Sequence, residues 1–277
     1  MTGQTTHDDV PAAGAMPMLG LGTWQNEDPE QCTESVRAAL EMGYRHVDTA
    51  KAYHNESAVG DGIAAAAVPR EEVFLATKVW AGDLAYEDVI ESAERSAERL
   101  GVETIDLLYI HWPSHAYDPE ETLPAFDELL DRGVIDRVGV SNFTPEQIER
   151  AQEVLDAPLF ANQVEMHPYL KQEELRAFAA EDDLNLVAYS PLGRGTVLDD
   201  DTLGEIAAKH DASVAQVSLA WLREKGVTAI PKATSEAHIR DNFESVSLDL
   251  DDADIAAIDA IDRTDRQIQP DWAPDSW

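Results

Sequence analysis

The sequence predicts an α/β protein, a (β/α)8 TIM barrel formed as a single domain by residues 1–277. Short apolar or β-branched runs alternate with helical patterns from one end of the chain to the other, which is typical of parallel βαβ units. Eight such units occur, and eight units in about 250 residues is the usual size of a closed barrel. No stretch rich in proline, glycine and serine divides the chain, so one domain is expected.

Eight strands are expected where apolar and β-branched residues cluster. In chain order, the predicted ranges are 18–22, 45–49, 73–79, 105–111, 134–141, 159–165, 184–190 and 227–232. A doubly wound open sheet is the alternative architecture. It is disfavoured because residues 20–23, GLGT, lack the third glycine of a dinucleotide-binding turn and no helical pattern begins there.

Helical periodicity fills the intervals between these strands, for example at 86–101 and 213–226. Helix starts are marked by capping residues, as in Thr144 followed by Pro145. Helix ends are marked by glycine, which adopts the positive φ of a C-terminal cap without strain. The glycines at such ends are Gly101, Gly133 and Gly226.

The charge of the chain is strongly negative, with 55 acidic and 20 basic residues and a net charge of -35. Such a surface repels nucleic-acid phosphates and anionic lipid headgroups, so neither nucleic acid nor membrane is expected as a partner. The acidic residues are spread along periodic segments that also contain apolar residues, which argues against a disordered acidic protein. We therefore predict a halophilic protein whose self-repulsion is screened by a salty cytoplasm.

Several protein classes are disfavoured by what the chain lacks. Cys32 is the single cysteine, so neither a disulfide framework nor a cysteine-rich metal site is expected. The first residues lack the basic start and long apolar run of a secretory signal, and no apolar stretch approaches membrane-spanning length. We predict a cytoplasmic protein, and a monomer because no surplus apolar helix face is apparent.

Each predicted strand ends in residues that carry hydrogen-bonding or ionisable groups. In a barrel, the loops that follow the strands gather at one mouth, where catalytic residues lie. We therefore expect an active site at this end of the barrel. The residues are Thr23, Trp24, Asp48, Tyr53, Lys78, Trp80, His111, Trp112, Ser141, Asn142, Gln163, Tyr189, Ser190, Lys232 and Thr234.

Lys78 follows the apolar run VFLAT, and a buried ammonium group needs a carboxylate partner. Asp48, at the end of the preceding strand, is the expected partner. A cation near Tyr53 would lower the pKa of its phenol, which suits a general acid working near neutral pH. His111 would donate to a developing oxyanion. Taken singly, Lys78 also fits a snorkelling lysine and His111 a hydrogen-bonded core histidine.

Two other kinds of chemistry are compatible with some of these residues. His46, Asp48, His111 and His115 could suggest a metal hydrolase, but no histidine or aspartate pair at later strand ends completes a ligand set, so no metal is expected. Lys78 or Lys232 could form a Schiff base, as in an aldolase. Pairing with Asp48 argues against this for Lys78, since an ion-paired ammonium is a poor nucleophile.

Six motifs resemble those of the aldo-keto reductase superfamily, in the family order, as in a prokaryotic-type, acidic and halophile-like member. The resemblance implies an NAD(P)H-dependent carbonyl reductase on a (β/α)8 barrel, acting on a small-molecule carbonyl substrate. Related barrels also serve as regulatory subunits, so a non-catalytic role is the competing hypothesis. The motifs are GYRHVDTAKAYHNE, IDLLYIHWP, GVSNF, ANQVEMHPYL, AYSPLGRG and IPKATSEAHIRDN.

The resemblance also implies roles for individual residues. Tyr53 would protonate the carbonyl oxygen, Lys78 paired with Asp48 would tune the pKa of Tyr53, and His111 would orient the carbonyl. The residues implied for the cofactor are Ser141, Asn142, Gln163 and Tyr189 at the nicotinamide, Ser190, Leu192 and Gly193 at the pyrophosphate, and Lys232, Thr234 and Asn242 at the adenosine end. Thr23 and His238 are also expected to bind the cofactor. Trp24, Trp80 and Trp112 would form the walls of the substrate pocket.

The cofactor preference follows from a departure from the family pattern. The family commonly has a serine directly after the lysine and an arginine six residues after it, and both help to bind a 2′-phosphate. Here these positions are Ala233 and His238, so NADPH is expected to be preferred through Lys232 while NADH is also used. The C-terminal segment RQIQPDWAPDSW is expected either to bring Trp272 or Trp277 to the substrate or to pack outside the barrel.

Overall fold

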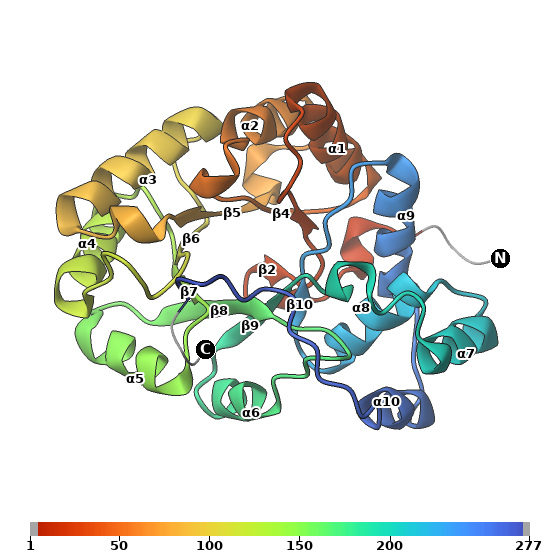
Figure 1. The fold of residues 1–277 in the computed structure, drawn as a ribbon. Coiled ribbons are helices and arrows are strands. Elements are labelled where there is room, and N and C mark those ends of the chain that lie inside the picture. The colour runs from red at the N-terminus through yellow and green to blue at the C-terminus, as the bar shows by residue number, and fades with distance from the viewer. Residues whose placement is uncertain (1–4, 274–277) are drawn as a thin grey trace.

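The computed structural model describes residues 5–273, whose central element is a barrel of eight parallel strands (Figure 1). The strands pair in chain order, and the bridges Leu19–Ala229 and Gly22–Lys232 join the last strand to the first, which closes the barrel. The predicted fold class is confirmed. The strands are β3 (Leu21–Gly22), β4 (His46–Asp48), β5 (Phe74–Val79), β6 (Leu107–Ile110), β7 (Val138–Ser141), β8 (Leu159–Glu165), β9 (Asn185–Tyr189) and β10 (Thr228–Ala229).

Helices surround the strands as an outer ring (Figure 1). The ranges 86–101 and 213–226, predicted as helical, correspond to α3 and α8. The helices are α1 (Pro29–Met42), α2 (Glu56–Ala65), α3 (Tyr86–Leu100), α4 (Pro119–Asp131), α5 (Pro145–Val154), α6 (Glu173–Glu181), α7 (Asp201–His210), α8 (Val214–Glu224), α9 (Glu236–Glu244) and α10 (Asp252–Asp259).

The expected capping chemistry is present at the helix ends. Thr144 precedes α5, and its side chain accepts a hydrogen bond from the backbone N–H of Gln147, whose own side chain accepts from the Thr144 N–H. Gly101 ends α3 in the left-handed region, with φ 67°, where glycine carries no side-chain strain. These caps fix where each helix begins and ends, and so how each loop leaves the barrel.

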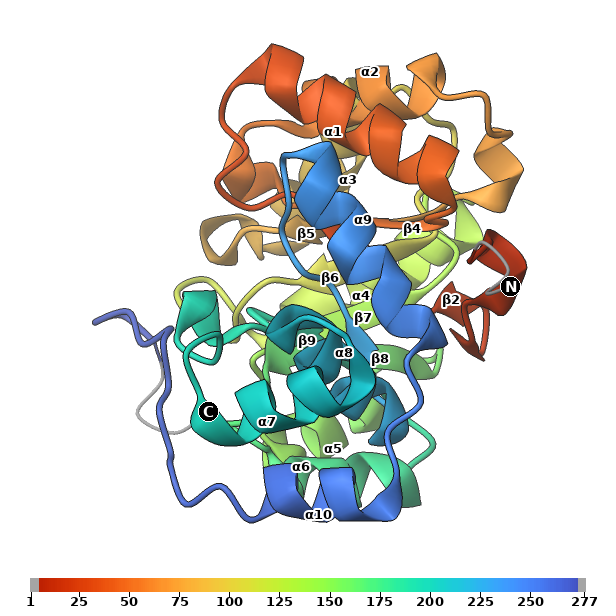
Figure 2. The ribbon, with the colours of Figure 1, turned by 90° about the vertical axis from the view of Figure 1, so that its right-hand side faces the viewer.

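An N-terminal hairpin, which the sequence did not indicate, closes one end of the barrel. It consists of β1 (Ala12–Ala13) and β2 (Met16–Pro17), paired antiparallel. Met16 is fully buried in the barrel interior with Phe74 and Leu107. Figure 2 shows the hairpin at the end of the molecule opposite the C-terminal segment. The open mouth of the barrel is therefore at the end where the C-terminal segment lies.

The alternation of side chains along the strands divides the interior into an apolar floor and a polar top. On β5, Phe74 and Ala76 belong to the interior cluster, so Lys78 is the next residue to point inward. On β6, Leu107 and Tyr109 are interior, so His111 is the next inward position. The side chains of Lys78 and His111 therefore point into the barrel because they follow the same alternation as the core residues that precede them on each strand.

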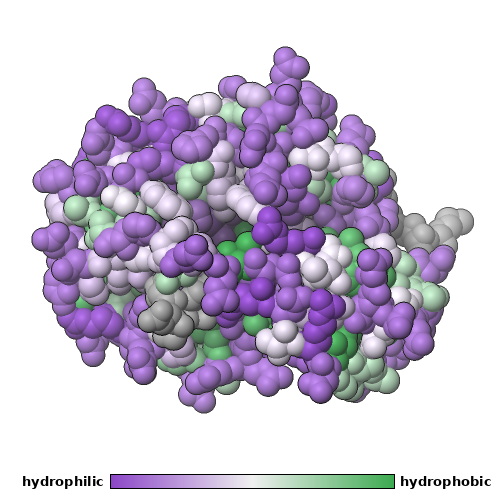
Figure 3. Space-filling view, viewed as in Figure 1, coloured by the Kyte–Doolittle hydropathy of each residue, from purple (hydrophilic) through white to green (hydrophobic). Residues whose placement is uncertain are grey.

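The outer surface is hydrophilic. Figure 3 shows hydrophilic residues over most of the face seen in Figure 1, with hydrophobic residues in the hollow at its centre. Between residues 5 and 273, no helix combines the length and apolar character needed to cross a membrane.

Candidate active site

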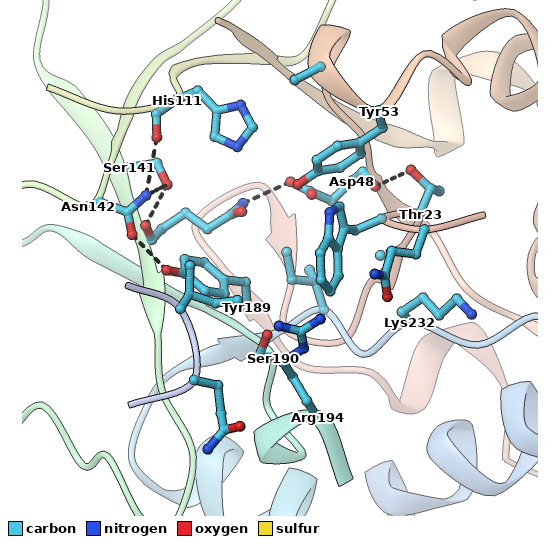
Figure 4. Close-up of a pocket in the computed structure, with 18 of the residues that line it drawn as sticks. Thr23, Asp48, Tyr53, His111, Ser141, Asn142, Tyr189, Ser190, Arg194 and Lys232 are labelled. Carbon is cyan, nitrogen blue, oxygen red and sulfur yellow. Dashed lines mark hydrogen bonds between the residues drawn. The ribbon is translucent and has the colours of Figure 1, made fainter. Parts of the chain in front are cut away.

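A cavity of about 860 Å³ opens at the C-terminal ends of the strands (Figure 4). Pockets that bind cofactors and drug-sized ligands have volumes of this order. Most of the residues expected at the site line this cavity. They are Thr23, Trp24, Asp48, Tyr53, Trp80, His111, Trp112, Ser141, Asn142, Gln163, Tyr189, Ser190, Leu192 and Lys232.

Lys78 and Asp48 form a buried ion pair at the floor of the cavity. Both side chains are almost inaccessible, and Lys78 Nζ lies 2.5 Å from Asp48 Oδ1 and donates a second hydrogen bond to the Thr49 carbonyl, at 2.7 Å. Gln163 Nε2 donates to the other carboxylate oxygen, at 2.8 Å. Burial lowers the pKa of Lys78, while the nearby carboxylates of Asp48 and Glu56 oppose that shift. The pair therefore places beneath the cavity an ammonium group whose positive charge is partly neutralised by Asp48.

Tyr53 stands above this pair, at the end of a short 3-10 turn, Lys51–Tyr53. Its ring centroid lies 5.2 Å from Lys78 Nζ and 5.8 Å from the ring of His111. Lys51 donates to Asp83 at 2.8 Å, which ties this turn to the turn that follows Trp80.

The expectation that Lys78 lowers the pKa of Tyr53 is wrong for this structure. Burial raises the pKa of Tyr53 well above its usual value, and the negative charge of Asp48 raises it further. The reason is that a phenolate would lose its hydration in the cavity, while the charge of Lys78 is already offset by its bond to Asp48. Tyr53 is therefore a fully protonated phenol at neutral pH.

His111 follows β6 at the edge of the cavity and touches Trp80, with ring centroids 5.5 Å apart. Burial, and then the charge of Lys78, hold the pKa of His111 well below its usual value. The ring is therefore neutral at pH 7. Its Nδ1 is a buried atom with no hydrogen-bond partner among the described residues. A neutral imidazole carries one N–H, which can donate to an oxygen in the cavity.

A connected band of amides and hydroxyls runs beside the ion pair, along β7, β8 and β9. Ser141 donates to the Gln163 carbonyl at 2.7 Å, and Tyr189 donates to Asn142 Oδ1 at 2.9 Å. Asn142 and Ser190, each directly after a strand, adopt φ of 64° and 48°. Non-glycine residues are uncommon in this region and cluster at functional sites. The band offers amide and hydroxyl groups to a planar ligand at the cavity wall.

The structure does not bring all of the expected cofactor residues to the cavity. Lys232 lines it, whereas Thr234 is half-buried outside it and His238 is exposed in the first turn of α9. Asn242 is buried within α9, and Gly193 is buried within the loop that follows β9. These four residues lie beyond the volume that the cavity encloses.

Arg194 lines the cavity but was not singled out from the sequence. Its guanidinium lies 4.6 Å from the ring centroid of Trp24, within the range of a cation–π contact. It stands between Gly193 and Gly195 and has a φ of 54°. A basic residue between two glycines, in the loop after a predicted strand, was the available signal.

The C-terminal tail, residues 261–273, also reaches the cavity. Residues 267–270 and Trp272 line it, and the ring of Trp272 lies 5.3 Å from that of Trp80 and 5.2 Å from that of Trp112. The tail therefore lies over the mouth rather than packing away from it. Trp277 lies outside the described residues.

A closed barrel with a buried lysine–carboxylate pair below a tyrosine, and amides beside them, is an enzyme scaffold equipped for proton transfer at its mouth. The chain belongs to the aldo/keto reductase family, whose sequence profile matches residues 18–263. The resemblance carried by the motifs is thus confirmed.

Similar proteins support this membership over nearly the whole chain. Glyoxal reductase of Bacillus subtilis (strain 168) is 41% identical over 251 residues, covering 91% of this chain and 91% of that protein. Methylglyoxal reductase DkgB of Escherichia coli O157:H7 is 38% identical over 266 residues, covering 95% and 99%. The crystal structure of an aldo/keto reductase from Brucella melitensis has a TM-score of 0.83 at 39% identity, covering 88% and 94%.

Membership of the family defines the activity class. The chain is an NAD(P)H-dependent oxidoreductase that reduces aldehydes and ketones to alcohols by hydride transfer, with a tyrosine as general acid.

Proposed function

We propose that Tyr53 is the general acid of this reaction and that Lys78, Asp48 and His111 support it. The observation that carries the proposal is the position of Tyr53, which lines the cavity with its ring 5.2 Å from Lys78 Nζ. Tyr53 gives its proton to the carbonyl oxygen. Lys78, whose charge is partly offset by Asp48, limits the cost of the phenolate that results, but not enough to bring the pKa of Tyr53 down to its usual value. Asp48 holds Lys78 in place, and the neutral ring of His111 donates to the carbonyl oxygen.

The bound nicotinamide cofactor supplies the hydride, and the residues at the cavity fit such a group. Of the described residues that line the cavity, Asp48 is the only carboxylate, and it is paired with Lys78. Arg194 and Lys232 supply positive charge at the same cavity, although the whole chain is strongly acidic. A phosphate-bearing ligand is favoured there. Ser141, Asn142, Gln163 and Tyr189 would hold the nicotinamide, Ser190, Leu192 and Arg194 the pyrophosphate, and Thr23 and Lys232 the remainder. Gly193, Thr234, His238 and Asn242 lie outside the cavity and would contact only a part of the cofactor that extends beyond it.

For the cofactor, we expect NADPH to be preferred and NADH also to be used. Lys232 remains to attract a 2′-phosphate, while the serine hydroxyl and the arginine charge of the family pattern are absent at Ala233 and His238. The measurement is kcat/KM for both cofactors with one aldehyde. A ratio between 1 and about 10³ is expected, since 10³ corresponds to roughly 4 kcal/mol. A larger ratio, or a preference for NADH, would contradict this.

The general-acid assignment is tested with Tyr53→Phe, followed by loss of NADPH absorbance with a panel of aldehydes and ketones. We expect kcat to fall by about 10²–10⁴, the usual contribution of a positioned acid, with cofactor affinity retained. Tyr109→Phe is the matched control, because that ring is also buried and lies 5.8 Å from Lys78 Nζ but does not line the cavity. An unchanged rate in Tyr53→Phe would refute the assignment.

Small dicarbonyl compounds are the first substrates to test, because two relatives are named glyoxal reductase and methylglyoxal reductase. Four tryptophans line the cavity, which also suits aromatic aldehydes. We further propose that the enzyme works as a single-domain monomer in a salt-rich cytoplasm, which the net charge of -35 supports.

A further inference from the structure

Glu165 is a buried charge that the proposed reaction does not use. It is the last residue of β8 and has no exposed surface. Two residues before it on the same inward face, Gln163 bonds to Asp48. Ionised carboxylates are rarely buried without partners, since their lost hydration must be replaced by hydrogen bonds. The partners of Glu165 therefore indicate what it does.

Three N–H groups bond to the Glu165 carboxylate, and two of them belong to the C-terminal tail. The backbone N–H of Gln267 donates to Oε1 at 2.7 Å, and that of Ile268 donates to Oε2 at 2.8 Å. The third is Nε2 of His167, at 2.9 Å. Because the Tyr169 N–H donates to Nδ1 of the same ring, at 3.3 Å, the proton of a neutral His167 lies on Nε2.

Residues shortly after Glu165 contact a more N-terminal part of the same tail, residues 261–265. The Tyr169 carbonyl accepts from the Asp265 N–H at 2.9 Å, and the guanidinium of Arg263 lies 4.1 Å from the Tyr169 ring centroid. Lys171 donates to the Ile261 carbonyl at 2.8 Å. One loop, residues 165–171, thus binds the tail at successive points along its length, and Glu165 is the contact next to the cavity.

The part of the tail beyond Glu165 forms a wall of the cavity, through residues 267–270 and Trp272. The far end of this wall is held by aromatic contacts with Trp80 and Trp112. Figure 2 shows the tail running along the mouth end of the barrel. At the point where the tail reaches the cavity, it is held by two of its backbone N–H groups, which any tail sequence could supply, and by one buried acceptor, Glu165.

We propose that Glu165 is a positioning residue that fixes the C-terminal tail as a wall of the substrate cavity, and thereby sets which carbonyl compounds bind. The proposal rests on the function proposed above. A carboxylate is needed because it accepts from both tail amides and from His167, whereas an amide presents one oxygen and one NH₂ donor. In Glu165→Gln, the NH₂ group of the amide would face at least one of the three N–H groups, and that N–H would lose its hydrogen-bond acceptor.

The test compares Glu165→Gln with the unchanged protein by amide hydrogen exchange and by steady-state kinetics. Exchange at Gln267 and Ile268 should become about tenfold faster, as expected for loss of one hydrogen bond to a charged group. KM for a biphenyl carboxaldehyde should rise about tenfold, while kcat/KM for methylglyoxal stays within about twofold. Tyr169→Phe is the comparison variant, since it removes a hydroxyl that contacts Asp200 and Arg263 but leaves the bonds of Gln267 and Ile268 to Glu165 in place.

The kinetic and exchange readouts separate the possible outcomes. Unchanged exchange at the two tail amides, or an equal loss of kcat/KM for both aldehydes, would overturn the proposal. If Glu165→Gln does not fold, Glu165→Asp gives the same test, because it keeps the charge and withdraws the carboxylate by one methylene. If the protein reduced no carbonyl compound, the proposed function would fail, while the exchange measurement would still decide the role of Glu165 in holding the tail.

Discussion

At the scale of single residues, the site depends on charges held where water cannot reach them. A buried ion pair contributes little to stability on balance, because its attraction is offset by the lost hydration of both partners. The pair of Lys78 and Asp48 is better explained by its position, since it places a cation beneath Tyr53, where the proposed mechanism develops negative charge. Gln163 fixes the second carboxylate oxygen, so the geometry does not depend on the salt bridge alone.

The pKa shifts predict an unusually flat dependence of the reaction on pH. The pKa of Tyr53 is raised, so its acid form persists to higher pH, and the pKa of His111 is lowered, so its neutral form persists to lower pH. We expect kcat/KM for an aldehyde to be level from about pH 6 to about pH 9 and to fall only above the ordinary tyrosine pKa of about 10.

This profile is measured with NADPH held saturating, with recovery of activity at pH 7 as the control for unfolding. A falling limb between about pH 7 and 8 would show that Lys78 does lower the pKa of Tyr53 in the working enzyme. The same limb should then shift in Lys78→Met.

At the scale of secondary-structure elements, β5, β6, β8 and β9 each place a site residue two positions after a residue of the barrel interior. The sequence predicted all eight strands, because alternating apolar and β-branched runs bounded by turn residues are a local signal. It also predicted their polar ends. The observed strands are mostly shorter than predicted, as in β3, where two residues of the range 18–22 are assigned as strand.

The elements that the sequence did not predict depend on partners far along the chain. The N-terminal hairpin has two residues in each strand, too few for a period to be visible. The tail has no secondary structure in the described residues, and its position is set by Glu165, which in the sequence is one of 55 acidic residues. The pKa of Tyr53 was misjudged because burial, which no local pattern reports, outweighs a neighbouring charge.

Helix α5 offers a test of capping next to the site. Its N-terminal cap is Thr144, which lies two residues after Asn142 and does not line the cavity. We expect Thr144→Ala to lower the free energy of unfolding by about 1 kcal/mol, the usual value of an N-terminal cap, with kcat/KM within about twofold. Urea denaturation measures the first quantity. Gln147→Ala, which removes only the reciprocal bond, should have a smaller effect, and an equal or larger one would contradict this account of the cap.

At the scale of the whole molecule, the excess of negative charge should make stability depend on salt. Salt weakens both the surface ion pairs and the general repulsion, and these two effects have opposite signs. With 55 acidic and 20 basic residues, repulsion is the larger effect. We expect Tm to rise by roughly 5–10 °C from dilute buffer to molar KCl, at about 2–4 °C for each kcal/mol gained.

The comparison for this measurement is a sugar solution of equal osmolarity, which favours compact states without screening charge. If the sugar stabilises the protein as much as KCl does, screening is not the cause. A Tm that is unchanged or lower in KCl would contradict adaptation to salt.

The closure of the barrel also has a consequence for biosynthesis. The bridges Leu19–Ala229 and Gly22–Lys232 join the first barrel strand to the last, and Lys232 and Trp24 line the same cavity. During translation, one edge of β3 therefore has no strand to pair with until nearly the whole chain has left the ribosome. The cofactor site and the finished barrel form in the same late step, so a nascent chain cannot bind its cofactor before its last strand is in place.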